Sequence, residues 1–349
     1  MTFPYEVCVL IGRFQPFHNG HLALLRLALA QAPLCVVVVG SAHSAASPKN
    51  PFSFDDRKAM IEQALRPDER ERVRVVPVRD YYNESRWATA VEAAVASTMG
   101  THKPTLIALL GHFKDESSSY LKAFPRWHLQ SVPRQGDIDA AQVRKVLFEL
   151  PAEALDKALA LYAGQLPATT LAFLLQWIHK PAWDAMRLEA TTIAHYKSLW
   201  RDAPYPPVFV TVDVVVVCQA RVLLIQRGHA PGKGRYALPG GYLDQQETTW
   251  QSALRELLEE TGLSADAIHA EKCLGGQHVF DHPARSLVGR IITHVYYFDL
   301  GERSLPAPTA GDDALSAEWF PISQLLQLED RLHDDHFMIL DHFLTLLPR

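Results

Sequence analysis

The chain has 349 residues, 48% of them hydrophobic and 21% charged, and a formal net charge of −5. This is the composition of a soluble globular protein, and the length suggests two domains, each large enough to bury its own core. The sequence has no long basic block, no secretory leader and no apolar run long enough to span a bilayer, which argues against nucleic-acid binding, secretion and membrane insertion. We therefore expect a cytoplasmic protein. Its cysteines form no CxxC pair and are expected to be buried thiols: Cys8, Cys35, Cys218 and Cys273.

The first half of the chain alternates apolar runs, typical of buried strands, with helical segments. Strands are expected at 5–12, 34–41, 72–78 and 104–111. Helices are expected at 21–32, 52–65, 86–100 and 140–150. Near-continuous apolar strands separated by helices are typical of a parallel sheet covered on both faces, so we predict an α/β fold with a doubly wound parallel sheet.

The pattern changes at about residue 151. Helical segments without strands follow at 154–164, 169–179 and 185–200, and the sequence leaves open whether they complete the first domain or cement an interface. The proline-rich segment 201–208 is typical of a linker and indicates a domain boundary near residue 203. The sequence after it is β-rich. A strand pair is expected at 208–218 and 221–227, and residues 291–300 alternate more weakly. We predict a first domain over 1–185, a helical and proline-rich linker over 186–205 and a second domain over 206–349.

The segment IGRFQPFHNGH, residues 11–21, follows the first expected strand and opens the first expected helix. A strand, a tight turn and a helix N-terminus together make an anion site, because backbone N–H groups and the helix dipole point at the ligand. Gly12 permits close approach of the backbone, and Arg13, His18 and His21 can face a polyphosphate. Neither a dinucleotide fingerprint nor a P-loop is present, so this phosphate site is of another kind.

GRFQPFHNGH resembles the H-x-G-H signature of the nucleotidyltransferase superfamily, and GRFQPFHNGHL is most similar to nicotinamide mononucleotide adenylyltransferases of the archaeal type. The resemblance implies a Rossmann-like domain in which Arg13, His18 and His21 face ATP. It also implies direct attack of the acceptor phosphate on the α-phosphorus, without a covalent intermediate. Such a reaction depends on positioning and electrostatics, which suits these residue types.

Further segments resemble the same enzymes. GSAHSAASPKNPFSFDDR resembles the loop after the second strand, RDYYNESRW the segment that holds the pyridine nucleotide, and GHFKDESSSYLKAFPRW a segment of bacterial fusions of this enzyme to a second domain. The resemblance implies that Trp87 stacks on the nicotinamide ring and that Gly111 and His112 lie close to adenosine. The implied substrate-binding residues are Gly12, Phe14, Arg57, Asp80, Asn83, Trp87, Gly111 and His112.

One segment departs from that family. The family carries a hydroxyl-rich S/T-x-x-R stretch that also holds the triphosphate, whereas this chain has DIDAAQVRK. Arg144 is kept and is implied as catalytic, but Ala140 and Ala141 stand where hydroxyls are expected. The missing hydrogen bonds would cost a few kcal/mol at most, on the order of 1–3 each.

A second constellation lies far downstream, in GGYLDQQETTWQSALRELLEETGL, residues 240–263. Glu256, Glu259 and Glu260 are spaced i, i+3 and i+4, so one helix face carries three carboxylates that repel one another unless a cation binds. Hard oxygen ligands suit Mg²⁺ or Mn²⁺. Arg255 can hold a carboxylate in place, and Gly262 is the expected C-cap of the helix.

This segment resembles the Nudix box, G-x5-E-x7-R-E-U-x-E-E-x-G-U, where U is apolar. The matching residues are Gly241, Glu247, Arg255, Glu256, Leu257, Glu259, Glu260, Gly262 and Leu263. The resemblance implies an α/β/α domain with a mixed sheet that hydrolyses a nucleoside diphosphate linked to another group, using a divalent metal. It implies Gly241, Glu256, Glu259 and Glu260 as metal ligands, with Glu259 and Glu260 also catalytic.

Substrate choice lies outside the box. FDHPARSLVGRIITHVYYFDL resembles Nudix enzymes that act on ADP-ribose and related ADP-ribose-sensing domains. Arg285 and Arg290 are candidates to hold phosphate or ribose, with ordinary surface arginines as the alternative. A further acid is expected from GDDALSAEWFPISQL, and the sequence does not choose among Asp312, Asp313 and Glu318.

Together the resemblances predict a bifunctional enzyme of NAD metabolism. The first domain would make NAD and pyrophosphate from ATP and nicotinamide mononucleotide, and the second would hydrolyse ADP-ribose to AMP and ribose 5-phosphate, with Mg²⁺ or alternatively Mn²⁺ as cofactor. Two alternatives remain: the second domain is a metabolite-sensing regulatory module, or the first adenylylates a different phosphorylated acceptor. Small-molecule substrates are the expected partners, and the oligomeric state, a homo-oligomer included, is left open.

Overall fold

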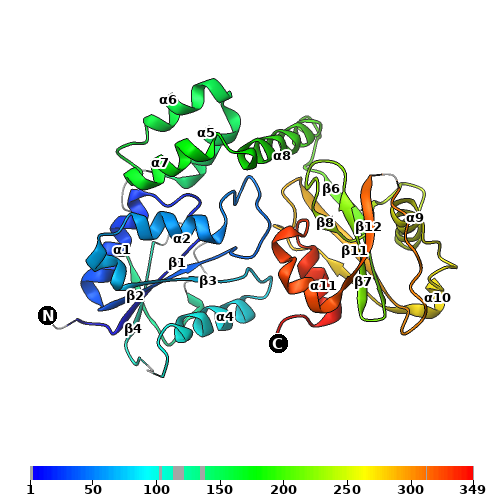
Figure 1. Ribbon diagram of the computed structural model, residues 1–349, viewed down its shortest axis with the longest axis horizontal. Coiled ribbons are helices and arrows are strands. Elements are labelled where there is room, and N and C mark those ends of the chain that lie inside the picture. The colour runs from blue at the N-terminus through cyan, green and yellow to red at the C-terminus, as the bar shows by residue number, and fades with distance from the viewer. Residues whose placement is uncertain (1–2, 102–103, 113–121, 134–137, 312, 349) are drawn as a thin grey trace. The chain divides into compact units, whose positions relative to one another are not determined.

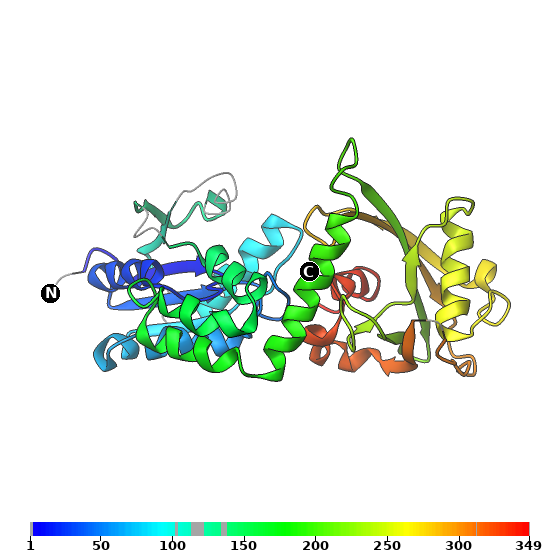
Figure 2. The ribbon, with the colours of Figure 1, turned by 90° about the horizontal axis from the view of Figure 1, so that it is seen from above.

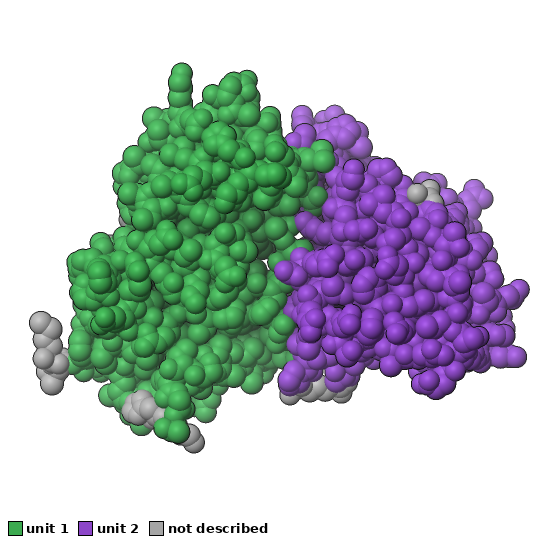
Figure 3. Space-filling view, in the orientation of Figure 1, with its two compact units in different colours: residues 1–190 green, residues 191–349 purple. Residues whose placement is uncertain are grey.

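The computed structural model describes residues 3–101, 104–112, 122–133, 138–311 and 313–348 (Figure 1). The chain divides into two compact units, unit 1 (Met1–Ala190) and unit 2 (Thr191–Arg349), coloured separately in Figure 3. The division falls inside helix α8 (Pro181–Ser198), so the first part of the predicted 186–205 linker is helical, and the predicted domain limits remain a prediction. Within the described residues, no helix is long and apolar enough to cross a membrane.

Unit 1 is built on a five-stranded sheet in which every neighbouring pair is parallel, which confirms the predicted architecture. The strand order is β3-β2-β1-β4-β5. The strands are β1 (Val7–Gly12), β2 (Leu34–Val39), β3 (Val73–Pro77), β4 (Ile107–Gly111) and β5 (His128–Ser131).

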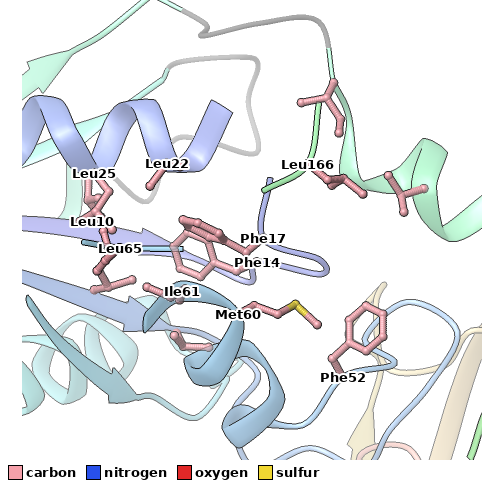
Figure 4. Packing of buried hydrophobic residues seen from close by; sticks show 14 of the residues in the cluster. Leu10, Phe14, Phe17, Leu22, Leu25, Phe52, Met60, Ile61, Leu65 and Leu166 are labelled. Carbon is pink, nitrogen blue, oxygen red and sulfur yellow. The ribbon is translucent and has the colours of Figure 1, made fainter. Parts of the chain in front are cut away.

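Helices cover both faces of this sheet because successive strand residues point to opposite sides. Val7 and Val9 of β1 share a core with Val91 of α4, whereas Leu10 packs with Leu25 of α1 on the other face (Figure 4). The helices up to residue 149 are α1 (Asn19–Gln31), α2 (Phe54–Gln63), α3 (Pro67–Glu71), α4 (Glu84–Ser97) and α5 (Ala140–Glu149).

The helical stretch after residue 151 completes the core of unit 1. It forms a short 3₁₀ turn (Ala152–Ala154), α6 (Leu155–Ala160) and α7 (Ala168–Trp177). Leu159 and Trp177 are buried in the same cluster as the α1 side of the sheet, and Trp183 of α8 donates its indole N–H to the carbonyl of Leu147 at 2.9 Å. Of the two roles left open by the sequence, the structure therefore supports completion of the first domain.

Unit 2 contains a mixed seven-stranded sheet with the order β10-β11-β6-β7-β12, to which β8 and β9 add by pairing with β7 and β6. β11 runs parallel to β6 and the other pairs are antiparallel. The strands are β6 (Val208–Cys218), β7 (Arg221–Arg227), β8 (Tyr236–Ala237), β9 (Gly240–Tyr242), β10 (Leu274–Phe280), β11 (Arg290–Asp299) and β12 (Ala314–Pro321).

Helices α9 and α11 lie on opposite faces of this sheet (Figures 1 and 2). Leu257 of α9 shares a buried core with Val212 and Val214 of β6, which places the apolar side of α9 against the sheet. Thr248 caps the N-terminus of α9, and Gly262 ends the helix with a left-handed φ of 68°, as predicted. The remaining elements are α9 (Thr249–Thr261), α10 (Ala270–Cys273), two 3₁₀ helices (Ile322–Gln327 and Glu329–Arg331) and α11 (His336–Leu344).

Candidate functional sites

The candidate site of unit 1 lies where the strand order of its sheet reverses. β1 and β4 are hydrogen-bonded neighbours, but the chain leaves β1 toward β2 on one side and β4 toward β5 on the other. In open α/β sheets, ligands bind outside the carboxyl ends of the strands at such a switch point. The predicted residues Gly12 and Gly111 end β1 and β4, so sequence segments far apart in the chain meet at this edge.

His18 and His21 form a reciprocal cap at the start of α1. Nδ1 of each ring accepts the backbone N–H of the other residue at 3.3 Å, and the rings stack with centroids 3.5 Å apart. Because Nδ1 is an acceptor in both rings, the proton of each neutral ring is on Nε2, which makes Nε2–H the donor for a phosphate oxygen. Burial, and then the charge of His18, lower the pKa of His21 well below its ordinary value, so His21 enters the site as a neutral donor.

The predicted substrate residues Gly12 and Phe14 help to position this histidine pair: Phe14 contacts His21, and Gly12 lies against Phe14. Phe14 adopts a left-handed φ of 52°, is buried, and packs edge-on against the His21 ring with centroids 4.9 Å apart. A Cβ on Gly12 would lie 2.9 Å from the Phe14 ring, so a larger residue at position 12 would displace that ring. Figure 4 shows Phe14 and Phe17 between Leu22 of α1 and Ile61 of α2.

Arg57, predicted to bind substrate, is buried and donates to backbone carbonyls. Its guanidinium donates to the carbonyls of Arg13 at 2.9 Å, Gly40 at 2.7 Å and Ser41 at 3.1 Å, and its Nε donates to Ser53. The side chain is 1% exposed, so it ties the turn after β1 to the turn after β2. The resemblance pointed to Arg57, but not to its contacts. The planar guanidinium has several N–H donors, which can bind backbone carbonyls as well as a phosphate.

Positive charge converges at the same edge of the sheet. Nη1 of Arg144 donates to the carbonyl of Gln15 at 2.6 Å, and Gln15 makes two hydrogen bonds with the backbone of Phe52. Loss of water, and then the charge of Arg13, lower the pKa of both Arg144 and Lys49. Lys49 was not singled out by the sequence analysis, although it lies within GSAHSAASPKNPFSFDDR, the segment that resembles the loop after the second strand.

The RDYYNESRW segment, predicted to hold the pyridine nucleotide, connects β3 to the first turns of α4. Asp80 accepts the backbone N–H of Ser41 at 3.1 Å and also its hydroxyl. Asn83 caps α4 by accepting the N–H of Arg86 at 2.8 Å. Trp87, on the first turns of α4, is partly buried and packs edge-on against Phe124 at 5.7 Å. Nδ1 of His112 lies 3.1 Å from the carbonyl of Val132, beyond the end of β4.

In unit 2, Arg255 of α9 organises the carboxylates of the second motif. Its Nε donates to both oxygens of Glu247 at 3.1 and 2.9 Å, and its Nη1 donates to Glu256 at 2.8 Å and Glu259 at 2.9 Å. Burial disfavours its charge, but the hydrogen bonds to Glu247, Glu256 and Glu259 outweigh it and raise the pKa of Arg255. The sequence predicted that Arg255 fixes one carboxylate; it fixes three.

The strand β9 packs directly against two of these acids. The N–H of Gly240 donates to Glu260 at 2.9 Å, and a Cβ on Gly241 would lie 2.5 Å from Oε1 of Glu256. Burial raises the pKa of Glu260 to about 8. The hydrogen bond from Gly240 lowers this pKa, and the negative charge of Glu256 raises it further. A buried carboxylate that resists ionisation beside a second one fits a divalent cation, whose charge would offset both.

The carboxylates do not form a closed cage. Within the part of the chain that the structure describes, no three His, Cys, Asp or Glu side chains converge closely enough to hold a metal ion. Glu259 is 43% exposed and is held by Arg255, whereas Glu256 and Glu260 are largely buried beside β9. The all-oxygen donor set fits Mg²⁺ or Mn²⁺ in its chemistry.

The two arginines predicted to contact substrate differ in their surroundings. Arg285 is 7% exposed and forms a bidentate ion pair with Asp335, at 3.0 and 2.8 Å. Arg290 donates to the backbone carbonyl of Asp281. Of the three candidate late acids, Asp313 pairs with His229 at 3.1 Å, Glu318 lies exposed on β12, and Asp312 lies outside the described residues.

Comparison with known proteins places both units. Residues 9–113 match the cytidylyltransferase-like family and residues 208–343 match the NUDIX domain family. The nicotinamide/nicotinic acid mononucleotide adenylyltransferase of Acinetobacter baylyi is 34% identical over 148 residues, 42% of this chain and 78% of that protein. The ADP-ribose pyrophosphatase of Methanocaldococcus jannaschii is 39% identical over 119 residues, 34% of this chain and 65% of that protein.

One solved structure spans both units. The crystal structure of a bifunctional NMN adenylyltransferase/ADP-ribose pyrophosphatase from Francisella tularensis, complexed with AMP and a manganese ion, matches with a TM-score of 0.87 and 32% sequence identity. The match covers 98% of this chain and 99% of that chain. The match spans both unit 1 and unit 2, and the chain therefore belongs to the family of bifunctional NMN adenylyltransferase/ADP-ribose pyrophosphatases.

Proposed function

We propose that unit 1 joins ATP and nicotinamide mononucleotide (NMN) into NAD and pyrophosphate, and that unit 2 hydrolyses ADP-ribose to AMP and ribose 5-phosphate with Mg²⁺ or Mn²⁺. The observation that carries this proposal is the match to the Francisella tularensis protein over nearly the whole of both chains. It makes the chain an adenylyltransferase and a Nudix pyrophosphohydrolase. The geometry of the two sites supports the named substrates.

In unit 1, a phosphate oxygen of NMN attacks the α-phosphorus of ATP, and pyrophosphate leaves. Nothing in this step requires a protein nucleophile, so the chain contributes position and charge. The Nε2–H groups of His18 and His21 donate to the phosphate oxygens that gain charge, and Arg13, Lys49 and Arg144 balance the triphosphate. Trp87 supplies an aromatic surface for the nicotinamide ring.

In unit 2, Glu256, Glu259, Glu260 and the carbonyl of Gly241 would hold the divalent cation. The chemistry that such a cation supplies is neutralisation of the pyrophosphate charge and activation of water. Arg255 orients Glu256 and Glu259, so their oxygens are preorganised before substrate binds. The hydrogen bond from Gly240 keeps Glu260 pointed at β9.

Product analysis by mass spectrometry tests both halves of the proposal on the full chain. Wild-type protein is incubated with ATP, NMN and Mg²⁺, and separately with ADP-ribose and Mg²⁺. His21→Ala should lower NAD formation by about 10²-fold or more, as loss of an oxyanion donor does, and leave ADP-ribose hydrolysis intact. Glu260→Gln should have the opposite effect. Matched controls are His179→Ala and Glu271→Gln, both at exposed positions.

The result also decides between the proposal and the alternatives. Wild-type protein that binds ADP-ribose but leaves it unchanged would make unit 2 a sensor. Adenylyl transfer to another phosphorylated acceptor, but not to NMN, would reassign unit 1. Near-normal NAD synthesis by His21→Ala would remove the histidine pair from the reaction.

A further inference from the structure

A histidine of α11 fixes the backbone that precedes the metal-binding carboxylates of unit 2. His336 is 7% exposed, and its Nδ1 accepts the backbone N–H of Leu238 at 2.8 Å. Because Nδ1 accepts a hydrogen bond, the ring proton is on Nε2. Nε2 lies 3.7 Å from Oδ1 of Asp213, which is longer than a hydrogen bond, so Asp213 is a close neighbour of the ring and the bond to Leu238 is what orients it.

The run from Leu238 to Gly241 is short, and its last two residues belong to β9 and pair with Val212 and Asp213 of β6. Pro239 has no N–H to donate, and its carbonyl accepts the N–H of Val214 at 2.8 Å. The N–H of Gly240 donates to Glu260 at 2.9 Å. His336 thus accepts the hydrogen bond of the buried Leu238 N–H. Leu238 lies two residues before Gly240, whose N–H holds Glu260, a predicted metal ligand.

The packing of this run against the carboxylates leaves little room for displacement. A Cβ on Gly240 would lie 2.2 Å from the carbonyl oxygen of Val212, and a Cβ on Gly241 would lie 2.5 Å from Glu256. The glycine backbone is therefore in direct contact with β6 on one side and with the acid of α9 on the other. A shift of this backbone by a fraction of an ångström would move Glu256 and Glu260 with it.

Asp213 connects the histidine to the same backbone. It lies opposite Gly240 in the β6–β9 pairing, and its Oδ1 would be 2.8 Å from a Cβ on that glycine. Its Oδ2 accepts the hydroxyl of Thr293 of β11 at 2.6 Å. Thr293, Asp213 and His336 thus form a buried polar group, from three different elements, against the backbone of Leu238–Gly241.

We propose that His336 is a positioning residue for metal binding by unit 2: it holds the backbone of Leu238–Gly241 and, through that backbone, sets the positions of Glu256 and Glu260. This proposal rests on the proposed metal-dependent hydrolysis. Residues that orient metal ligands typically change metal affinity or activity by about 10–100-fold when substituted. His336 touches neither substrate nor metal in this arrangement.

Two substitutions of His336 separate hydrogen bonding from packing. His336→Leu fills a similar space but cannot accept the N–H of Leu238, whereas His336→Asn places an amide oxygen where Nδ1 now lies. His342→Leu is the matched control, because His342 is on the same helix but its ring stacks on His278, with centroids 4.1 Å apart. For each full-length protein, the Kd for Mn²⁺ alone, kcat and KM for ADP-ribose, and Tm are measured.

We expect His336→Leu to weaken Mn²⁺ binding and lower kcat by about 10-fold or more, and His336→Asn to recover most of both. NAD synthesis by unit 1 should be unchanged in all variants. A folded His336→Leu protein with wild-type Mn²⁺ affinity would overturn the proposal. Equal losses of Mn²⁺ affinity and kcat in the Leu and Asn variants, in proportion to their loss of Tm, would also overturn it. If wild-type protein binds Mn²⁺ but does not hydrolyse ADP-ribose, the proposed substrate is wrong, and the Mn²⁺ comparison still decides the role of His336.

Discussion

Arg57 offers a direct test of whether a motif residue contacts substrate or supports the site. In Arg57→Met, the apolar stem is kept but the carbonyls of Arg13, Gly40 and Ser41 lose their donor. The carbonyl of Ser53 keeps the helical N–H of residue 57. Each buried hydrogen bond to a charged group contributes about 1.5–3 kcal/mol, but removal of a buried charge recovers part of the total. We expect a net loss of about 2–4 kcal/mol.

For a unit of this size, 1 kcal/mol corresponds to about 2–4 °C, so the Tm of unit 1 should fall by roughly 4–16 °C, measured by calorimetry. Arg57→Lys should give a smaller loss, because the ammonium keeps the charge and can still donate to some of these carbonyls, although it cannot reach all three as the planar fork does. Lys58→Met is the control, since the Lys58 side chain is 42% exposed and lies 4.0 Å from Glu62 in a surface pair. An unchanged Tm with a raised KM for ATP would show that Arg57 binds substrate and would refute the structural interpretation.

Three further predictions concern single positions. Trp87→Ala should raise KM for NMN, equivalent to about 1–3 kcal/mol if ring stacking resembles base–aromatic stacking, with little effect on KM for ATP; equal changes in both would indicate packing only. Gly241→Ala should abolish ADP-ribose hydrolysis because its Cβ would displace Glu256, whereas Gly276→Ala, with only Phe343 nearby at 3.9 Å, should not. Burial lowers the pKa of His336 to about 4, so the unfolded chain takes up a proton on this residue near pH 6.5 and the folded chain does not. Its contribution to the unfolding free energy should therefore fall by up to about 3 kcal/mol between pH 6.5 and 4, measured as the difference between wild type and His336→Asn; identical pH profiles would contradict it.

Local sequence patterns predicted most of the fold. The apolar runs identified all four of the longer parallel strands of unit 1, and the spacing of Glu256, Glu259 and Glu260 identified helix α9 with its Gly262 cap. The short strand β5 was not predicted, because HLQS is neither apolar nor β-branched enough to be distinguished from a loop. Elements whose residues carry their own periodicity are visible in sequence, whereas elements stabilised by neighbours are not.

The candidate sites divide in the same way. The carboxylates of unit 2 lie on one helix, so their relation to one another is a property of helical spacing. The roles of Arg57 and His336 depend on backbone carbonyls and N–H groups far away in the chain, which have no side-chain signature. Phe14 illustrates the same limit: its left-handed backbone and its contact with His21 became visible only with the fold.

The departure at residues 139–144 shows how structure changes the meaning of a missing motif. The sequence indicates lost hydroxyls at Ala140 and Ala141, but Asp139 accepts the N–H of Ala141 at 2.8 Å and caps α5 with a carboxylate. A carboxylate at a helix N-terminus offsets the positive end of the helix dipole, so α5 offers a phosphate less attraction than an uncapped helix would. Arg144, one turn further on, remains anchored to the turn after β1 through the carbonyl of Gln15. We therefore expect side chains at the sheet edge, Arg144 among them, rather than this helix end, to carry the positive charge for a triphosphate in unit 1.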